Sequence, residues 1–280
     1  LVDINGILAN IMILTEDTTK TVGVGGDFTT LNLAINWCKK VIPNGYKVTL
    51  QLMAGFVMQE QVMLNNVNLG FVEIIGTDVV TSIDGAYITN GIILDGDLAE
   101  FYPAFYGYGS IMPVINHRFT FSSNVSGEYN SYGIIVRKNS YCKVLENKGF
   151  TNVHGVGIGV FEKSEANIEL AYFSGSGTGC HIGGASTVSA RKCKFDNCVN
   201  YGIIISTGST LNFDNGSAVN CGSNGVSVRF GSFVNVHNSN LSGAGAHGIG
   251  LSFGGGTVFA YATTGTLSQT ANTITANGII

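Results

Sequence analysis

The chain has 280 residues, of which 45% are hydrophobic and 11% are charged, and its formal net charge is −4. This charge balance excludes a nucleic-acid-binding surface, because phosphate groups require a stripe of Lys and Arg side chains. The hydrophobic content excludes an intrinsically disordered chain, so the 39 glycines fit tight turns between ordered segments.

The first residues, LVDINGILANIMIL, are apolar but have neither a basic leader nor an initiator Met. They match neither a signal peptide nor a membrane span, which needs about 20 apolar residues. We therefore expect no membrane insertion, and we expect residues 1–20 to connect this segment to the rest of a longer chain.

A short amphipathic helix is predicted over residues 29–40. Leu31 and Ile35 recur at helical spacing, and Asp27 or Thr29 is suited to cap the N-terminus. Such a helix would cover the open end of a stack of strands, which would otherwise pair with other chains.

Strand-forming segments follow the helix. Apolar and polar residues alternate at Val48, Leu50 and Leu52, and the segment FVEIIGTD predicts another strand. Residues 84–131 break this pattern with an aromatic-rich stretch that holds two of the three prolines. We interpret this stretch as a loop excursion from the strands.

From residue 132 onward a Gly-aliphatic signature repeats with a period close to 23 residues. The signature glycines are Gly133, Gly155, Gly179, Gly202, Gly225 and Gly248, with successive differences of 22, 24, 23, 23 and 23. Apolar residues follow each glycine at positions +1 and +3, such as Val156 and Ile158 in the second repeat. Alternation with period 2 puts each such pair on one face of a strand, and a fixed period of this size is typical of a solenoid.

Two further strands share the period. The second gives the apolar columns Val188, Leu211, Val234 and Ala190, Phe213, Val236, Phe259, and the third gives Phe195, Ala218, Leu241. Three short strands per repeat predict an all-β, right-handed parallel β-helix with about 23 residues per coil. We expect one β-helix domain over residues 21–265, with regular coils at 132–265 and a C-terminal tail at 266–280.

The segment GGDFTTLNLAI, the helix, VTLQLMAGFV and FVEIIGTD together resemble the entry of pectate-lyase-like β-helices. The resemblance is greatest to bacteriophage tailspike and tail-fibre proteins. It covers residues 21–265 as architecture, and its specific motif is limited to residues 21–80. It implies homotrimers on the virion that bind bacterial surface polysaccharide and often cleave or deacetylate it. The catalytic motifs of pectate lyases, polygalacturonases and alginate epimerases are missing, so no catalytic residue is carried over by motif.

An outward column of the second strand reads Arg191, Asp214, His237. Such a column places one side chain per coil, about 4.8 Å apart, so a linear polysaccharide lying along it would meet each in turn. Asp214 between two basic residues would stay ionised and orient His237 as a base, while Arg191 would neutralise a uronic acid or a developing oxyanion. The same residues also fit an ordinary surface ladder of charges, which contributes little to stability.

A second acidic group, Glu162, Glu165 and Glu169, lies in the coil from Gly155 to Gly179, which has one extra residue. An inserted residue can re-aim a side chain toward a ligand. A solvated face explains the three glutamates equally well.

Tyr102, Tyr106 and Tyr108 are the candidate substrate-binding residues. A tyrosine offers an apolar face to a sugar ring and a hydroxyl group to its neighbours. Packing against the solenoid or against a sister chain would use the same residues. The six cysteines show no metal-ligand spacing, and we expect neither a metal nor a cofactor.

The leading hypothesis is a phage tailspike or tail-fibre segment that recognises a bacterial surface polysaccharide on behalf of the virion. If it also degrades that polysaccharide, it would be a glycosidase or a lyase. The nearly uncharged walls favour a homotrimer. One alternative is a free-standing, extracellular polysaccharide lyase, hydrolase or epimerase, and another is a non-catalytic structural or adhesive β-helix at the bacterial surface.

Overall fold

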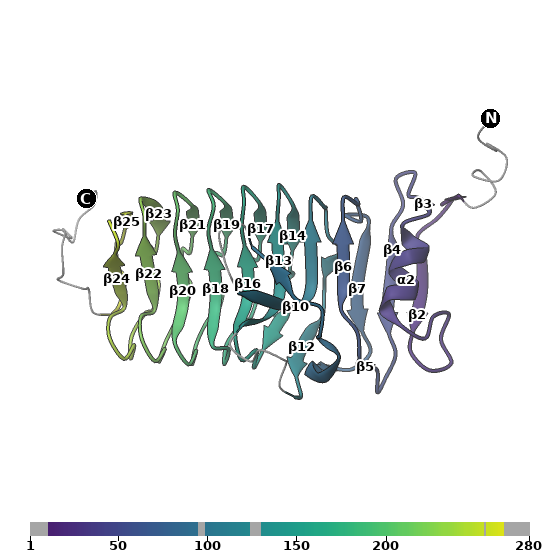
Figure 1. The fold of residues 1–280 in the computed structure, drawn as a ribbon, viewed down its shortest axis with the longest axis horizontal. Coiled ribbons are helices and arrows are strands. Elements are labelled where there is room, and N and C mark those ends of the chain that lie inside the picture. Colours follow the sequence, from purple (N-terminus) through teal and green to yellow (C-terminus); the bar gives the residue numbers. More distant parts are fainter. Residues whose placement is uncertain (1–10, 95–98, 124–129, 255, 266–280) are drawn as a thin grey trace.

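Strands of neighbouring coils pair in parallel and in register, so the coils stack along one long axis (Figure 1). This computed structural model describes residues 11–94, 99–123, 130–254 and 256–265. The first ten residues of the expected connector and the expected tail at 266–280 lie outside the described residues. The predicted all-β parallel β-helix with a short helix at its N-terminal end is confirmed.

The first wall of the β-helix is a nine-stranded sheet that contains the signature strands. Its strands are β6 (Val62–Asn65), β10 (Glu100–Tyr108), β13 (Ser131–Arg137), β16 (Val156–Val160), β18 (Thr178–Ile182), β20 (Tyr201–Ile205), β22 (Val226–Arg229) and β24 (Ile249–Ser252), with β9 (Ile92–Ile93) antiparallel on β10.

The second wall joins a four-stranded and a six-stranded sheet through a bridge between Ile115 and Val144. Its strands are β2 (Thr18–Val22), β4 (Val48–Leu52), β7 (Val72–Gly76) and β11 (Val114–Ile115), followed by β14 (Tyr141–Lys143), β17 (Glu165–Asn167), β19 (Thr187–Ser189), β21 (Thr210–Asn212), β23 (Ser232–Asn235) and β25 (Gly256–Phe259). Because β2 pairs with β4, the end of the expected connector is part of this wall.

The third wall is the narrowest. It consists of β5 (Val57–Met58), β8 (Thr81–Ile83), β12 (Arg118–Phe121) and β15 (Gly149–Thr151), and single bridges continue it through Tyr172, Lys194, Ser217, Asn240 and Thr264. The remaining elements are β1 (Met12–Ile13), which pairs with β3 (Val41–Ile42), and a 3-10 turn, η1 (Gly85–Tyr87).

Helix α2 (Leu31–Cys38) lies at the N-terminal end of the stack, and its buried side chains join the core of the β-helix. Its N-cap is Thr30, one residue beyond the expected Thr29, and the Glu60 carboxylate also accepts hydrogen bonds from the first helical N–H groups. Asp27, the other expected cap, instead accepts hydrogen bonds from Thr21 and Lys20, which lower its pKa to about 2.

The signature glycines are required because each coil approaches the next too closely for a side chain. A Cβ atom placed on Gly133, Gly157, Gly179, Gly202 or Gly225 would lie 2.5–2.8 Å from the carbonyl oxygen of the glycine in the following coil. Real Cβ atoms do not come this close to an oxygen. The repeated glycine therefore marks a steric constraint on stacking.

The register corrects one repeat of the predicted signature. Ile134 pairs with Ile158, and Tyr132 pairs with Val156. The second signature glycine is therefore Gly157 instead of Gly155, and the extra residue belongs to the coil that precedes it. Val156 consequently packs in a small cluster outside the main core, where an inward position was expected.

A second insertion shifts the last coil. Val234 pairs with Val258 and Asn235 pairs with Phe259. The expected place of Phe259 in an inward column was therefore wrong, and its side chain is exposed.

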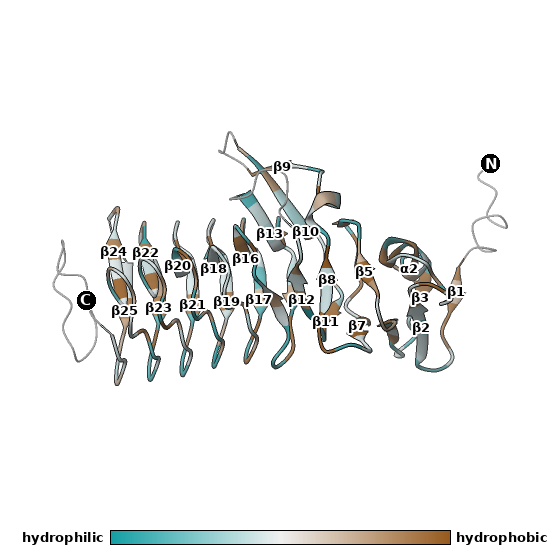
Figure 2. Cartoon of the chain, turned by 90° about the horizontal axis from the view of Figure 1, so that it is seen from below, coloured by the Kyte–Doolittle hydropathy of each residue, from teal (hydrophilic) through white to brown (hydrophobic). Residues whose placement is uncertain are grey.

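Residues 84–131 differ from the expected loop excursion. Strand β10 pairs in parallel with β6 and β13, and β11 and β12 join the other two walls, so residues 100–121 form a coil of the β-helix. Strand β9 and the adjoining end of β10 stand out from the row of coils (Figure 2). The aromatic residues that interrupt the 23-residue pattern include Phe105, which is fully buried in the core and packs with a tilted ring against Phe119, 5.4 Å between centroids.

Replacing one signature glycine tests the stacking constraint. Gly202→Ala would push a Cβ atom against the carbonyl oxygen of Gly225, and overpacking of this kind costs about 1–3 kcal/mol. Urea unfolding should show this loss of stability. Thr187→Ala, which trims an exposed strand residue, is the control and should stay within about 0.5 kcal/mol of the parent; an equal effect of both substitutions would contradict the constraint.

Candidate functional site

One outward column lies at the corner that follows the second wall. Each member stands two residues beyond the end of a second-wall strand, namely Glu169 after β17, Arg191 after β19, Asp214 after β21, His237 after β23 and Tyr261 after β25. The strand register keeps these residues on successive coils. The structure therefore brings together the three expected catalytic residues and adds one neighbour at each end, and we call these five residues the corner ladder.

Arg191 is neutralised by the coil before it. Its Nε and Nη2 atoms donate hydrogen bonds of 3.0 and 2.8 Å to the two carboxylate oxygens of Glu169. Ser189 donates a further bond of 2.7 Å to the same carboxylate. The bonds from Arg191 and Ser189 lower the pKa of Glu169, so this carboxylate is a poor general acid at neutral pH.

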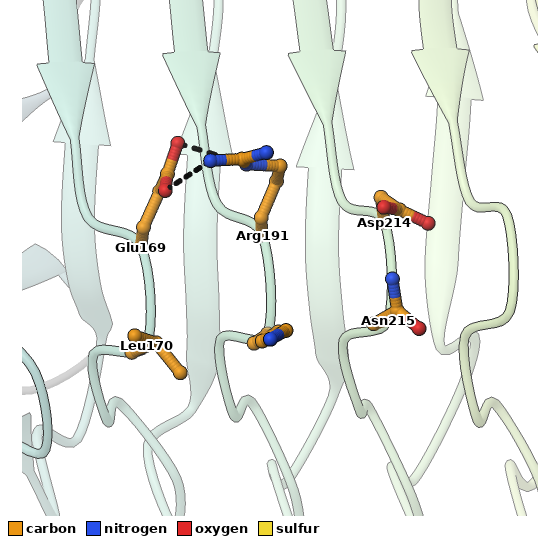
Figure 3. Close-up of a pocket in the computed structure, with 6 residues that line it drawn as sticks. Glu169, Leu170, Arg191, Asp214 and Asn215 are labelled. Carbon is orange, nitrogen blue, oxygen red and sulfur yellow. Dashed lines mark hydrogen bonds and ion pairs between the residues drawn. The ribbon is translucent and has the colours of Figure 1, made fainter.

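Asp214 lies on the other side of Arg191. The arginine side chain points toward Glu169 and away from Asp214 (Figure 3). One carboxylate oxygen of Asp214 is buried and has no hydrogen-bond partner among the described residues. A buried acceptor without a partner is costly, and a ligand that donates a hydrogen bond would remove that cost.

His237 belongs to an aromatic stack. Its ring lies parallel to that of Tyr261, with an interplanar angle of 10° and 5.2 Å between centroids. The hydrogen bonds of the described residues include none between Asp214 and His237, so the expected orientation of the histidine by the aspartate is absent from this arrangement. The stack instead leaves a flat, half-exposed aromatic surface at the C-terminal end of the corner ladder.

The corner ladder borders a shallow pocket of about 190 Å³. Glu169, Arg191 and Asp214 line one side, and Leu170 and Asn215 line the other (Figure 3). The pocket is also lined by Lys192, so that each ladder residue is followed by a lining residue, namely Leu170, Lys192 or Asn215. The last three residues have left-handed backbones, with φ between 56° and 62°. This conformation turns the chain sharply after each ladder residue and leaves room beside it.

The three candidate tyrosines lie on β10, in the first wall, and the structure does not bring them to the corner ladder. Tyr106 is only 6% exposed and belongs to a small apolar cluster with Tyr132 and Phe161, so it offers no face to a sugar. Tyr108 packs against the same cluster, and Tyr102 donates a hydrogen bond of 2.6 Å to Glu100.

An ion pair closes this apolar cluster at one end. The Arg137 guanidinium is nearly buried, bonds to the Glu162 carboxylate and donates to the carbonyl oxygen of Ile93. It also lies 5.7 Å from the Tyr108 ring. These contacts link β9 to the neighbouring strands of the first wall. We therefore interpret Tyr106, Tyr108 and Glu162 as packing residues and not as ligand-binding residues.

The chemistry that the corner ladder offers is recognition of hydroxyl groups. Its carboxylates accept hydrogen bonds, and its aromatic stack presents an apolar face. No group of three or more metal-ligating side chains is found within the described ranges. In the same ranges, no helix is both long and apolar enough to cross a membrane.

Glu169 and Tyr261 are the ladder residues that the 23-residue period does not place in this column. A step of 23 residues back from Arg191 reaches Ile168, which is fully buried. The coil from Gly157 to Gly179 has only 22 residues, so the neighbour of Arg191 is Glu169. The buried serines Ser140, Ser164, Ser186 and Ser209, spaced by 24, 22 and 23 residues, carry the signal that would have located the insertion.

Comparison with known proteins adds one finding. Residues 109–264, more than half of the chain, match the family described as "Right handed beta helix region". No curated protein matches the chain.

The pairing within the corner ladder can be tested by titration. Because Arg191 lowers the pKa of Glu169, Arg191→Gln should raise it toward the value of an unperturbed glutamate, about 4.3. Carboxylate chemical shifts measured by NMR between pH 2 and 7 report this change. Lys192→Gln, which removes the other cation of the pocket, should leave the Glu169 titration in place; identical titrations in the parent and in Arg191→Gln would contradict the pairing.

Proposed function

This chain belongs to the right-handed β-helix family, and on that premise we propose that it recognises a polysaccharide along the corner ladder. The proposal concerns a linear chain of sugars that lies parallel to the long axis and meets one side chain on each successive coil. The rung spacing of about 4.8 Å is close to the length of one sugar unit, so neighbouring rungs meet neighbouring sugars.

The observation that carries the proposal is Asp214, which lines a pocket of the corner ladder and has a buried carboxylate oxygen without a hydrogen-bond partner among the described residues. The hydroxyl groups of a sugar can donate the hydrogen bond that this oxygen lacks. The His237–Tyr261 stack one and two coils further on supplies an aromatic surface for the apolar face of a sugar ring. An acceptor beside an aromatic platform suits a sugar, which has hydroxyl groups and an apolar ring face.

The finer proposal is that the chain is part of a bacteriophage tailspike or tail fibre and binds the surface polysaccharide of a bacterium. Its support is the resemblance of residues 21–80 to the entry of such β-helices. The same proposal includes a homotrimer on the virion. It is supported by outward residues of the first wall that are small, such as Gly183, Ser206 and Gly250, and by the low charge of the chain.

Binding is favoured over cleavage as the role of this site. A glycosidase needs one carboxyl group with a raised pKa as its general acid, and the pKa of Glu169 is lowered. Arg191 is already paired with Glu169, so a role in neutralising an oxyanion would require that pair to open. A free-standing polysaccharide-degrading enzyme and a structural spacer are therefore the other outcomes of the test.

The test is incubation of the purified protein with a panel of bacterial surface polysaccharides. Binding is measured by calorimetry, and product size and new reducing or unsaturated ends are measured by chromatography. We expect binding without shortening. Asp214→Asn should weaken binding about tenfold, because a hydrogen bond to a charged acceptor contributes roughly 1.5–3 kcal/mol.

Glu16→Gln is the matched control, since it removes an exposed carboxylate at the opposite end of the chain, and it should bind like the parent. Shortened products would establish an enzyme instead, and their end groups would separate a hydrolase from a lyase. Absence of binding across the panel would contradict the proposed function and favour the spacer.

A further inference from the structure

We infer that the outer face of the first wall holds a second site, centred on Arg229, that binds the carboxylate of an acidic sugar. This inference rests on the proposed function, because it takes the ligand to be a polysaccharide. It deepens that function by naming the class of sugar. We assign the role expected of Arg191, neutralising a uronic acid, to an arginine that has no acidic partner among the described residues.

Arg229 ends β22 and is held in place by neutral contacts. Its Nε atom donates a hydrogen bond of 3.1 Å to Ser227, and its guanidinium lies 5.4 Å from the Tyr201 ring and 5.7 Å from the Phe253 ring. Among the described residues, no carboxylate lies within ion-pair distance of it. The terminal nitrogens of the group thus remain available to an external anion.

The other arginines of the outer surface have different partners from those of Arg229. Arg137 and Arg191 each bond to a glutamate. In the part of the chain that the structure describes, Arg118 also lacks an acidic partner, but it donates to a main-chain carbonyl oxygen and lies over one ring, that of Tyr172. Arg229 lies 5.4 and 5.7 Å from two aromatic ring centroids and its Nε atom is bonded to Ser227, contacts that restrain the plane of its fork. A planar fork pairs with a carboxylate through two parallel hydrogen bonds.

The neighbours of Arg229 along its own column are small. The adjacent coils place the half-buried Ser206 and Ser252 on either side of it. Ser227, two residues earlier on the same strand, is buried and accepts the hydrogen bond from Arg229. The column therefore holds no bulky side chain beside the guanidinium.

Two exposed phenylalanines flank this surface. Phe230 and Phe253 occupy the turns that follow β22 and β24, their rings stack at 5.5 Å, and they are 54% and 65% exposed. Both have left-handed backbones, with φ of 49° and 51°, a conformation that is unfavourable for bulky residues. Neither burial nor backbone geometry accounts for phenylalanine at these positions. An aromatic platform for the apolar face of a sugar ring does account for it.

His181 completes the wall in the direction of the N-terminus. Its ring packs edge-on against Phe161 at 5.0 Å, and burial together with the nearby charge of Arg229 lowers its pKa to about 4. The imidazole is therefore neutral at pH 7 and adds no second positive charge to the site. Recognition of the acidic group depends on Arg229 alone, while the neutral imidazole is suited to bond with hydroxyls.

The test compares hexagalacturonate with the same oligomer after chemical reduction of its carboxyl groups. Calorimetry on the intact chain should show that the parent protein binds the acidic oligomer at least about tenfold more tightly than the reduced one. Arg229→Gln should remove this preference while leaving binding of the reduced oligomer unchanged. Arg229→Lys, which keeps the charge but loses the fork, should retain only part of the preference.

Arg118→Gln is the matched control, since it removes an arginine that also lacks an acidic partner and lies over a tyrosine ring. It should bind both oligomers like the parent. A full preference in Arg229→Gln, an equal loss in Arg118→Gln, or no preference by the parent would overturn the inference. Binding of a neutral polysaccharide that depends on Asp214 but not on Arg229 would leave the proposed function standing and refute this inference alone.

Discussion

The close approach of each coil to the next is the constraint on which the rest of the structure depends. At the signature glycines the carbonyl oxygen of the following coil occupies the space that a Cβ atom would need. This contact fixes the register of the first wall, and the register fixes which residues recur at every outward position. The corner ladder exists because the strands of successive coils pair in register, so that equivalent positions of successive coils lie side by side.

The periodicity predicts the fold well, because a steric requirement that recurs on every coil leaves a regular trace in the sequence. It fails where coil length changes. The extra residue lies one coil earlier than the period predicts. For this reason the prediction put Val156 on the inward face and did not place Glu169 in the column of Arg191. The inward position predicted for Phe259 is wrong because the last coil also has an inserted residue. The predicted loop excursion over residues 84–131 is wrong for residues 100–121, because a coil rich in Phe and Tyr fills the core without the aliphatic signature.

The chemistry of the site was less predictable than its position. The spacing of Arg191, Asp214 and His237 placed them in one column, but pairing depends on which neighbour each side chain reaches. Arg191 turns toward Glu169, and His237 stacks on Tyr261. As a result Asp214 keeps an acceptor oxygen that has no partner among the described residues, and Arg229, the cation that we propose meets an acidic ligand, is on a different wall. A sequence reports positions, whereas rotamers and ion pairs decide which charges remain available.

In both the corner ladder and the wall around Arg229, the repeated backbone geometry places different side chains at equivalent positions along an extended surface. The central claim is that a polysaccharide lies along these outer surfaces, and side-chain footprinting by hydroxyl radicals tests it most directly. With a bound polysaccharide, the account predicts that His237, Tyr261, Phe230 and Phe253 become protected, while the exposed Tyr87 and Tyr46 on the N-terminal coils react as before. Unchanged reactivity of the first four residues, or protection confined to the N-terminal coils, would contradict it.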